Sequence, residues 1–205
     1  MARLSLARPQ RTLQNPSIVE FLFSNRRMAW LWLIVRVYVG YQWFEAGLGK
    51  ITNPAWMNGG NALKGFWERA VAIPEQGKPL IAFDWYRTFL STMLEQGHYT
   101  WFAKFVAIGE LLVGVGLIVG AFVGVAALAG AFMNWNYIMA GSASTNGLLL
   151  CLGIGLVVAW KIAGYIGLDY YLLPILDTFW RREATPAKAP SNIPVAPSPA
   201  SITTA

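Results

Sequence analysis

The feature that most constrains this chain is an apolar stretch that runs from Trp101 to Gly141. Its only charged residues are Lys104 and Glu110. Because about 20 apolar residues in a helix cross the ~30 Å hydrocarbon core of a membrane, this stretch is long enough for two crossings. The segment Gly-Ala-Phe-Val-Gly at residues 120–124 offers two flexible points for a turn. We therefore predict two membrane-spanning helices joined within that segment.

Two further apolar runs predict a first and a last span. They extend from Met28 to Leu48 and from Gly147 to about Lys161. Hydrophobic residues make up 56% of the chain and charged residues 13%, whereas a soluble domain has about 25% charged residues. The surface must therefore face something other than water, and the predicted fold is an all-α membrane protein, a four-transmembrane-helix bundle.

The basic residues indicate how this bundle is oriented. They cluster in the segment 1–27 and again near the C-terminus, at Arg3, Arg8, Arg11, Arg26, Arg27, Arg181, Arg182 and Lys188. Because cytoplasmic segments carry an excess of Lys and Arg, both termini are predicted to be cytoplasmic. Two ends on one side require an even number of spans. The segment 1–27 lacks an early apolar core, so we expect a retained basic cytoplasmic segment rather than a cleaved signal peptide.

Two segments are predicted not to span. The segment 53–100 is mixed polar and aromatic, which is too aromatic for a disordered loop. We expect short amphipathic helices on the outer face of the bundle, most clearly over 82–96, although interfacial anchoring alone would also explain the aromatic residues. The segment 184–205 is rich in Pro, Ala and Ser and predicts a disordered tail.

Composition also excludes several classes of function. The formal charge is +6, but the basic residues flank apolar runs instead of following one helix face, so no nucleic acid is expected as a partner. The chain has one cysteine, Cys151, and one histidine, His98. It therefore has no internal disulfide, dithiol centre or zinc site. No metal or flavin site is recognisable.

Polar residues inside the spans are informative because an unpaired charge in lipid is costly. At 1.5 Å per helical residue, Arg36, Glu110 and Asn134 lie at roughly 12, 16 and 18 Å from the inner surface. We therefore predict an ion pair between Arg36 and Glu110, with Asn134 as a hydrogen-bonding neighbour. Such a pair can serve a site, or it can serve only to fix the register of the helices.

A second polar layer is predicted nearer the outer surface, beneath the aromatic loop, and we place a ligand there. Lys50 sits at its rim. For Glu45 an ordinary interfacial carboxylate is an equally good interpretation. The members of the layer are Glu45, Asn136, Tyr137, Ser142, Ser144, Thr145 and Asn146.

Three stretches of the chain resemble the DoxX/DoxD family of small membrane proteins. Residues 44–50 read Phe-Glu-Ala-Gly-Leu-Gly-Lys, and residues 109–114 read Gly-Glu-Leu-Leu-Val-Gly. Residues 133–146, which contain Asn-Trp-Asn-Tyr, Gly-Ser and Thr-Asn, are the most specific. Gly-Leu-Asp followed by Leu-Leu-Pro at 167–174 is also similar to the DoxD-like branch. The resemblance covers about residues 28–175.

This resemblance implies a four-helix protein of a bacterial or archaeal inner (plasma) membrane. DoxD is the large subunit of thiosulfate:quinone oxidoreductase, also called thiosulfate dehydrogenase (quinone). That enzyme oxidises thiosulfate to tetrathionate, passes the electrons to membrane quinone and contains a second, small subunit. The resemblance therefore implies quinone as the electron acceptor and a small partner subunit.

The first functional hypothesis is accordingly a membrane oxidoreductase subunit that passes electrons from thiosulfate, or another small sulfur compound, to quinone. Trp43, Trp135 and Tyr137 are expected to line a quinone slot. Glu110 and Glu45 are the candidate catalytic residues, because a carboxylate can deliver protons to quinone. Lys50, with Lys64 or Arg69, would attract the thiosulfate dianion. The candidate substrate-binding residues are Arg36, Lys50, Asn134, Asn136, Tyr137 and Ser142.

The competing hypothesis is a non-catalytic integral membrane subunit of a larger respiratory or photosynthetic assembly. In that case the buried polar groups specify the bundle, and the aromatic outer loop docks another protein. A small-solute transporter is a weaker alternative, because the polar layer is thin and the sequence has no clear inverted repeat.

Overall fold

The computed structural model describes residues 16–183, and within that range the chain is helical, with no strand. Residues 1–15 and the predicted tail at 184–205 lie outside the described residues. In chain order the elements are α1 (Ser17–Ser24), η1 (Arg26–Met28), α2 (Ala29–Ile51), α3 (Pro54–Met57), α4 (Asn61–Val71), α5 (Asp84–Glu95), α6 (Tyr99–Val119), α7 (Val123–Met139), α8 (Asn146–Val158), α9 (Trp160–Ala163) and α10 (Asp169–Glu183).

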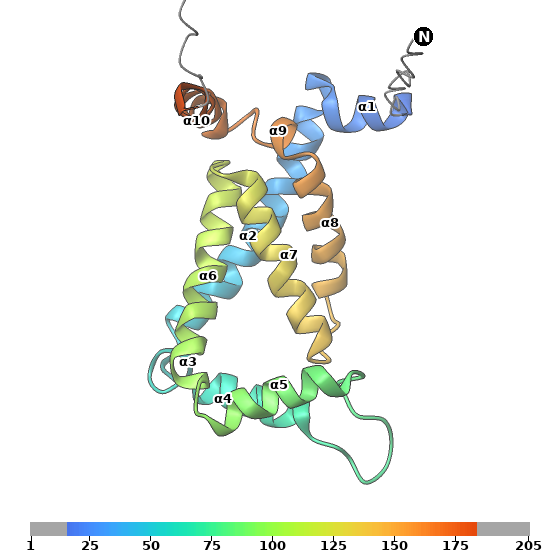
Figure 1. Ribbon diagram of the computed structural model, residues 1–205, viewed down its shortest axis with the longest axis vertical. Helices are drawn as coiled ribbons and strands as arrows, with labels where there is room; N and C mark the ends of the chain where they lie inside the picture. Colours follow the sequence, from blue (N-terminus) through green and yellow to red (C-terminus); the bar gives the residue numbers. More distant parts are fainter. Residues whose placement is uncertain (1–15, 184–205) are drawn as a thin grey trace, which may run out of the picture.

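Four helices, α2, α6, α7 and α8, lie alongside one another as a bundle (Figure 1). Helix α2 packs mainly on α6, and α7 packs mainly on α8. The prediction of an all-helical fold is therefore confirmed. The centre of the bundle is apolar, and its most buried members include Val39, Trp43, Val113, Leu117, Val123, Ala127 and Leu156.

One helix of the bundle, α6, is long and apolar enough to cross a membrane. Its 21 residues correspond to about 30 Å of helix. Helices α7 and α8 are apolar but shorter, with 17 and 13 residues. Helix α2 has 23 residues and carries three charged side chains, Arg36, Glu45 and Lys50.

The outward faces of the four bundle helices expose large apolar side chains along their length. Isolated exposed apolar residues are normal on a soluble protein, but a surface made of them requires an apolar partner. The residues at least 60% exposed are Trp30, Ile34, Phe105, Leu112, Val125, Leu128 and Phe132.

The turn between α6 and α7 falls where the sequence predicted it. Helix α6 ends at Val119, and Gly120 adopts the left-handed conformation, with φ 73°. This conformation carries little penalty only for glycine. A side chain at Gly120 would also collide with the guanidinium of Arg36. Glycine at position 120 therefore allows both the left-handed backbone of this turn and the close approach of the Arg36 side chain.

Glycines bring α2 and α6 close together. A Cβ atom on Gly47 would lie 2.5 Å from the backbone nitrogen of Leu111. A Cβ atom on Gly114 would collide with the backbone of Phe44. Only glycine allows two helices to approach this closely, so these two positions fix how α2 and α6 are aligned.

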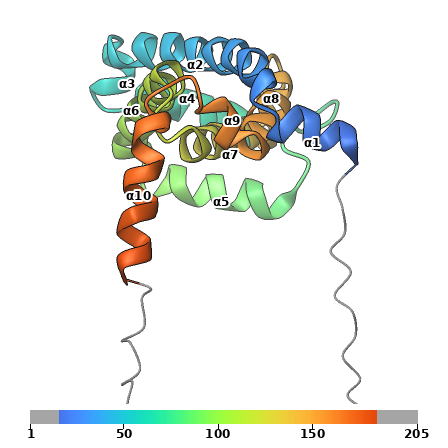
Figure 2. The same cartoon turned by 90° about the horizontal axis from the view of Figure 1, so that it is seen from above.

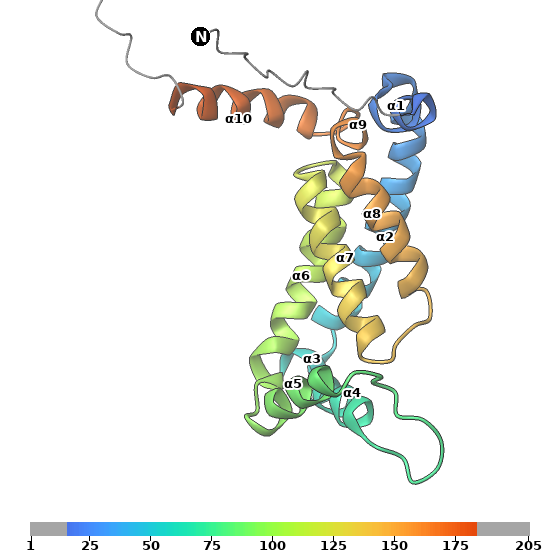
Figure 3. The ribbon, with the colours of Figure 1, turned by 45° about the vertical axis from the view of Figure 1, so that its right-hand side comes forward.

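The two ends of the bundle are covered differently. At one end α1, α9 and α10 lie, so both ends of the described chain are there (Figure 1), and α10 extends away from the bundle, across its long axis (Figures 2 and 3). At the opposite end α3, α4 and α5 form a cap, which we call the roof. The roof has its own apolar cluster, made of Leu63, Trp67, Ala70, Ile81, Tyr86 and Leu90 with Ala103 and Ala140 of the bundle.

The roof contains the short helices predicted for the outer loop. Helix α5 runs from Asp84 to Glu95, inside the predicted segment 82–96. Helix α4 is amphipathic as well, since Leu63, Trp67 and Ala70 are buried and Glu68 and Arg69 are exposed. The aromatic residues of this segment are therefore not all surface anchors.

A candidate site between the bundle and the roof

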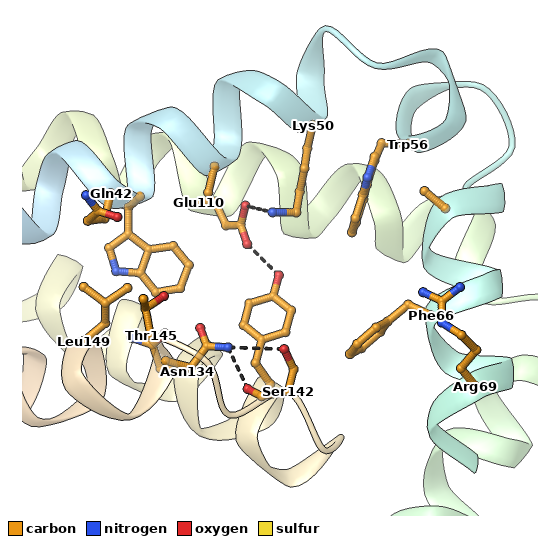
Figure 4. Close-up of a pocket in the computed structure, with 15 residues that line it drawn as sticks. Gln42, Lys50, Trp56, Phe66, Arg69, Glu110, Asn134, Ser142, Thr145 and Leu149 are labelled. Carbon is orange, nitrogen blue, oxygen red and sulfur yellow. Dashed lines mark hydrogen bonds and ion pairs between the residues drawn. The ribbon is translucent and has the colours of Figure 1, made fainter. Parts of the chain in front are cut away.

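A cavity of about 490 Å³ lies where the bundle meets the roof. Its size is within the usual range of small-molecule sites, about 300–1,000 Å³. Helices α2, α6, α7 and α8 supply one side, and α3 and α4 supply the other (Figure 4). The lining residues are Gln42, Trp43, Ala46, Lys50, Trp56, Ala62, Phe66, Arg69, Glu110, Asn134, Tyr137, Ser142, Thr145, Asn146 and Leu149.

The carboxylate of Glu110 is the buried charge of this cavity, with 1% of its side chain exposed. Lys50 Nζ lies 2.6 Å from its Oε2 atom, and the hydroxyl of Tyr137 donates to its Oε1 atom at 2.5 Å (Figure 4). Three helices thus meet at one carboxylate, which is the arrangement that a buried charge requires. Gly47, one turn before Lys50, allows the close approach of α2 and α6 that makes the ion pair possible.

Lys50 connects this buried carboxylate to the roof. Its side chain is 20% exposed, and its ammonium group lies 5.1 Å from the centre of the Trp56 ring in α3. A cation over the face of an indole ring is attracted by the ring electrons. Tyr137, Glu110 and Lys50 therefore form a continuous chain of hydrogen-bonded groups, which runs from the cavity wall to the roof.

Aromatic side chains supply a large part of the remaining wall. Trp43 is 4% exposed, and the rings of Phe66 and Tyr137 meet edge to face at 6.3 Å. Gly130 makes room for Trp43, because a Cβ atom there would lie 2.9 Å from the indole nitrogen. Walls of this kind suit a flat, largely apolar ligand.

The amide of Asn134 is the one lining group whose two polar atoms are both buried and without a hydrogen-bond partner among the described residues. The residue is 0% exposed, and neither Oδ1 nor Nδ2 has a hydrogen-bond partner among the described residues. Asn146, on the same wall, donates instead to the carbonyl oxygen of Ser142 at 2.7 Å. The two lining asparagines therefore differ, and only Asn134 retains both of its polar atoms for another molecule.

The charge on the cavity wall is positive on balance. Its charged residues are Lys50, Arg69 and Glu110, and Lys50 is paired with Glu110. Arg69 projects from α4, is exposed and makes no ion pair within residues 16–183. An uncompensated guanidinium at the roof favours anions near the cavity.

The predicted ion pair between Arg36 and Glu110 is wrong. Arg36 donates to the carbonyl oxygens of Ala163 and Ile166, at 2.9 Å each, at the end of the bundle that carries α10. The depth estimate assumed that α2 begins at the level where α6 ends. In the structure Gly40 packs on Leu117, so α2, which begins at Ala29, extends nearly three turns beyond the end of α6. Arg36 is therefore level with the turn that follows α6 and is far from Glu110.

The other predicted site residues divide into two groups. The first group lines the cavity and contains Glu110, Lys50, Asn134, Tyr137 and Ser142. Three predicted site residues lie elsewhere: Arg36, Glu45 and Asn136. Glu45 is exposed on α2.

Asn136 attaches the roof to the bundle. Its Oδ1 atom and its backbone carbonyl accept from the Tyr86 hydroxyl at 3.2 and 3.1 Å, and its Nδ2 atom donates to the carbonyl of Phe132. Burial raises the pKa of the Tyr86 hydroxyl, so Tyr86 remains a donor at neutral pH. Asn136 therefore has a structural partner for each polar atom.

Two more predicted contributors lie outside the cavity. Trp135 was expected in the aromatic slot, but it is 39% exposed and packs near Tyr86. Lys64 was expected to attract an anion, but its Nζ atom lies 3.7 Å from Oε1 of Glu68 on the exposed face of α4. Of the expected slot residues, Trp43 and Tyr137 do line the cavity.

Several lining residues were not foreseen as members of a site. Gln42, Ala46 and Lys50 are spaced four residues apart on α2, so they share one helix face. That spacing is visible in the sequence and would have added Gln42. Trp56 and Phe66 could not be assigned in this way, because their place depends on how the roof folds over the bundle.

Within residues 16–183, no group of three or more His, Cys, Asp or Glu side chains is placed to hold a metal ion. Comparison with known proteins finds no matching family model, no similar curated protein and no similar solved structure. The resemblance to the DoxX/DoxD family therefore stays a prediction from the sequence.

Proposed function

We propose that α2, α6, α7 and α8 each span a membrane and that both termini are cytoplasmic. The outward faces of these helices expose large apolar side chains, which lipid would cover. Arg26, Arg27 and Lys161 belong to the elements at the end of the bundle that carries α10. By the positive-inside rule this end faces the cytoplasm, and the roof faces the outside. The family resemblance favours an inner (plasma) membrane.

On this proposal the chain is the membrane subunit of an oxidoreductase that passes electrons from thiosulfate, or another small sulfur compound, to membrane quinone. One observation carries it: the buried carboxylate of Glu110 is held between Lys50 and Tyr137 on the wall of an aromatic cavity. Quinone needs an apolar slot and a source of protons, and this cavity combines the two. A small partner subunit belongs to the proposal, as the family resemblance implies.

The reaction balances in electrons and protons. Two thiosulfate ions form a new S–S bond between their terminal sulfur atoms, which gives tetrathionate and releases two electrons. Quinone accepts these electrons together with two protons and becomes quinol. Each of the two protons takes the same path: Tyr137 gives its hydroxyl proton to a quinone oxygen, Lys50 returns a proton to Tyr137 through Glu110, and water on the roof side reprotonates Lys50. Arg69 attracts the thiosulfate dianion toward the cavity.

The test is reduction of decylubiquinone by thiosulfate in membranes that contain the chain, with candidate small subunits supplied. We expect Glu110→Gln to lower turnover roughly 100-fold or more, since general acid–base catalysis typically contributes that much. Glu95→Gln is the matched control, because Glu95 is exposed on α5 and does not line the cavity. Equal turnover in the Glu110 and Glu95 variants, or no thiosulfate-dependent turnover above empty membranes, would contradict the proposal.

A second candidate, the non-catalytic subunit of a larger assembly, is favoured by the outer surface of α5. Phe83, Trp85 and Phe89 are 53%, 59% and 49% exposed there, and adjacent exposed aromatic rings are typical of protein interfaces. Purification of the protein from native membranes distinguishes the two candidate functions. A stable complex that is lost in Trp85→Ser, without thiosulfate-dependent turnover in any preparation, would favour the assembly subunit.

A further inference from the structure

Among the described residues that line the cavity, Asn134 is the one whose side-chain polar atoms are both buried and unpartnered. A buried donor or acceptor without a hydrogen bond costs about 1–3 kcal/mol. Most buried polar groups in folded proteins have a partner, so this amide marks the place where a ligand presents polar atoms of its own.

The surroundings of Asn134 limit the shape of that ligand. Trp43, Tyr137 and Leu149 line the same cavity, and the Tyr137 hydroxyl is already engaged with Glu110. A ligand that fills this space is flat and mostly apolar, and one polar group must reach α7. Arg69, in α4 at the roof, lies on the opposite side of the cavity (Figure 4).

The chemistry of a carboxamide limits the polar group further. An amide NH₂ donates and an amide oxygen accepts. We infer that Asn134 is the residue that recognises the ring oxygen of a quinone in both redox states. Nδ2 donates to the carbonyl of the oxidised ring, and Oδ1 accepts from the hydroxyl of the reduced ring. The choice of quinone rests on the proposed function, whereas the need for a polar group beside Asn134 rests on the structure alone.

Two substitutions separate this role from a packing role. Asn134→Leu removes both hydrogen-bonding atoms at similar size. Asn134→Asp keeps the size but leaves a group that only accepts when ionised. Asn61→Leu is the control for the same exchange, because Asn61 is exposed on α4 and does not line the cavity.

The experiment measures equilibrium binding of decylubiquinone and of its quinol to the full chain in lipid nanodiscs, with empty nanodiscs as the blank. We expect Asn134→Leu to weaken binding of both forms roughly 3- to 10-fold, which corresponds to one hydrogen bond. Asn134→Asp is expected to shift the ratio of the two affinities toward the quinol, and Asn61→Leu is expected to leave both affinities unchanged.

Stability provides an independent readout. Replacement of an unpartnered buried amide by an apolar side chain of the same shape is nearly neutral or stabilising. The ligand-free Asn134→Leu variant should therefore melt at or above the temperature of the wild type.

The outcomes are separable. If the wild type binds quinone but Asn134→Leu binds both forms equally well, or Asn134→Asp leaves their affinity ratio unchanged, the role of Asn134 is overturned and the proposed function stands. If the wild type binds no quinone above empty nanodiscs, the proposed function is overturned as well.

Discussion

The two ends of the bundle each contain a buried charged centre, and the two centres are satisfied in different ways. Near α10, Arg36 donates to two backbone carbonyls, and Asp169 accepts from the backbone N–H groups of Phe122 and Val123 at 2.6 and 2.8 Å. Near the roof, Glu110 is satisfied by the side chains of Lys50 and Tyr137.

The surroundings of the two centres differ as well. Neither Arg36 nor Asp169 lines the cavity beneath the roof, whereas Glu110, Lys50 and Tyr137 all do. Groups bound to backbone hold chain segments in place and are not available to a ligand. A buried charge in an apolar bundle therefore does not by itself indicate a site. A site is indicated by the type of hydrogen-bond partner, side chain or backbone, and by an adjoining cavity.

The largest effect is expected for Lys50→Met. This change leaves the carboxylate of Glu110 buried without its cation, which typically costs about 3–5 kcal/mol. In the double variant Lys50→Met with Glu110→Gln the buried charge is gone, so most of the loss should be recovered. Thermal unfolding of the purified protein in detergent measures both variants. A double variant as unstable as Lys50→Met alone would show that the pair is not what stabilises this end.

Arg36→Met is expected to be destabilising by about 2–4 kcal/mol, because two buried carbonyls lose their donor. In contrast to Lys50, substitution of a hydrogen-bond partner cannot recover the loss, since the hydrogen-bond partners of Arg36 are backbone atoms. The same unfolding measurement applies, with Lys104→Met as the control because Lys104 is exposed on α6. Full stability in Arg36→Met would mean that these hydrogen bonds do not hold the α9 segment to the bundle.

Tyr137→Phe removes one hydrogen bond to a charged group, which is worth about 1.5–3 kcal/mol. We expect a modest fall in stability and, if the cavity reduces quinone, roughly a 100-fold loss of turnover, because Tyr137 is the direct proton donor. Tyr86→Phe is the control, because Tyr86 of the roof donates to Asn136 of α7 and does not line the cavity. Equal turnover in the two variants would remove Tyr137 from the proton path.

The smallest effect is expected for Arg69→Gln. Arg69 is exposed and without an ion pair among the described residues, so stability should change by less than about 0.5 kcal/mol. The KM for thiosulfate should rise about two- to threefold at low salt, and the difference should shrink as added salt screens the charge. A difference independent of salt would argue against electrostatic attraction.

The sequence predicted the helices well because helical boundaries depend on local features. The turn after Val119 depends on Gly120, and α5 depends on the apolar spacing within 82–96. Glu110 and Asn134 were placed at one level, and both do line the cavity.

The partner of Glu110 was missed because it depends on how far one helix is shifted along another. A count of residues from the membrane surface placed Arg36 opposite Glu110, but α2 begins beyond the end of α6. The position of Trp56 in the cavity wall could not be predicted from the sequence, for a related reason. It depends on the path of the roof, which the whole tertiary structure determines.

The glycines between α2 and α6 have a consequence for protein engineering. Gly47 and Gly114 carry no charge and touch no ligand, yet they fix which residues of the two helices face one another. Transplanting Lys50 and Glu110 into another pair of helices would not reproduce the 2.6 Å contact unless both glycines were transplanted too. The smallest portable unit of this site is therefore a four-residue pattern across two helices, in which half of the positions have no side chain.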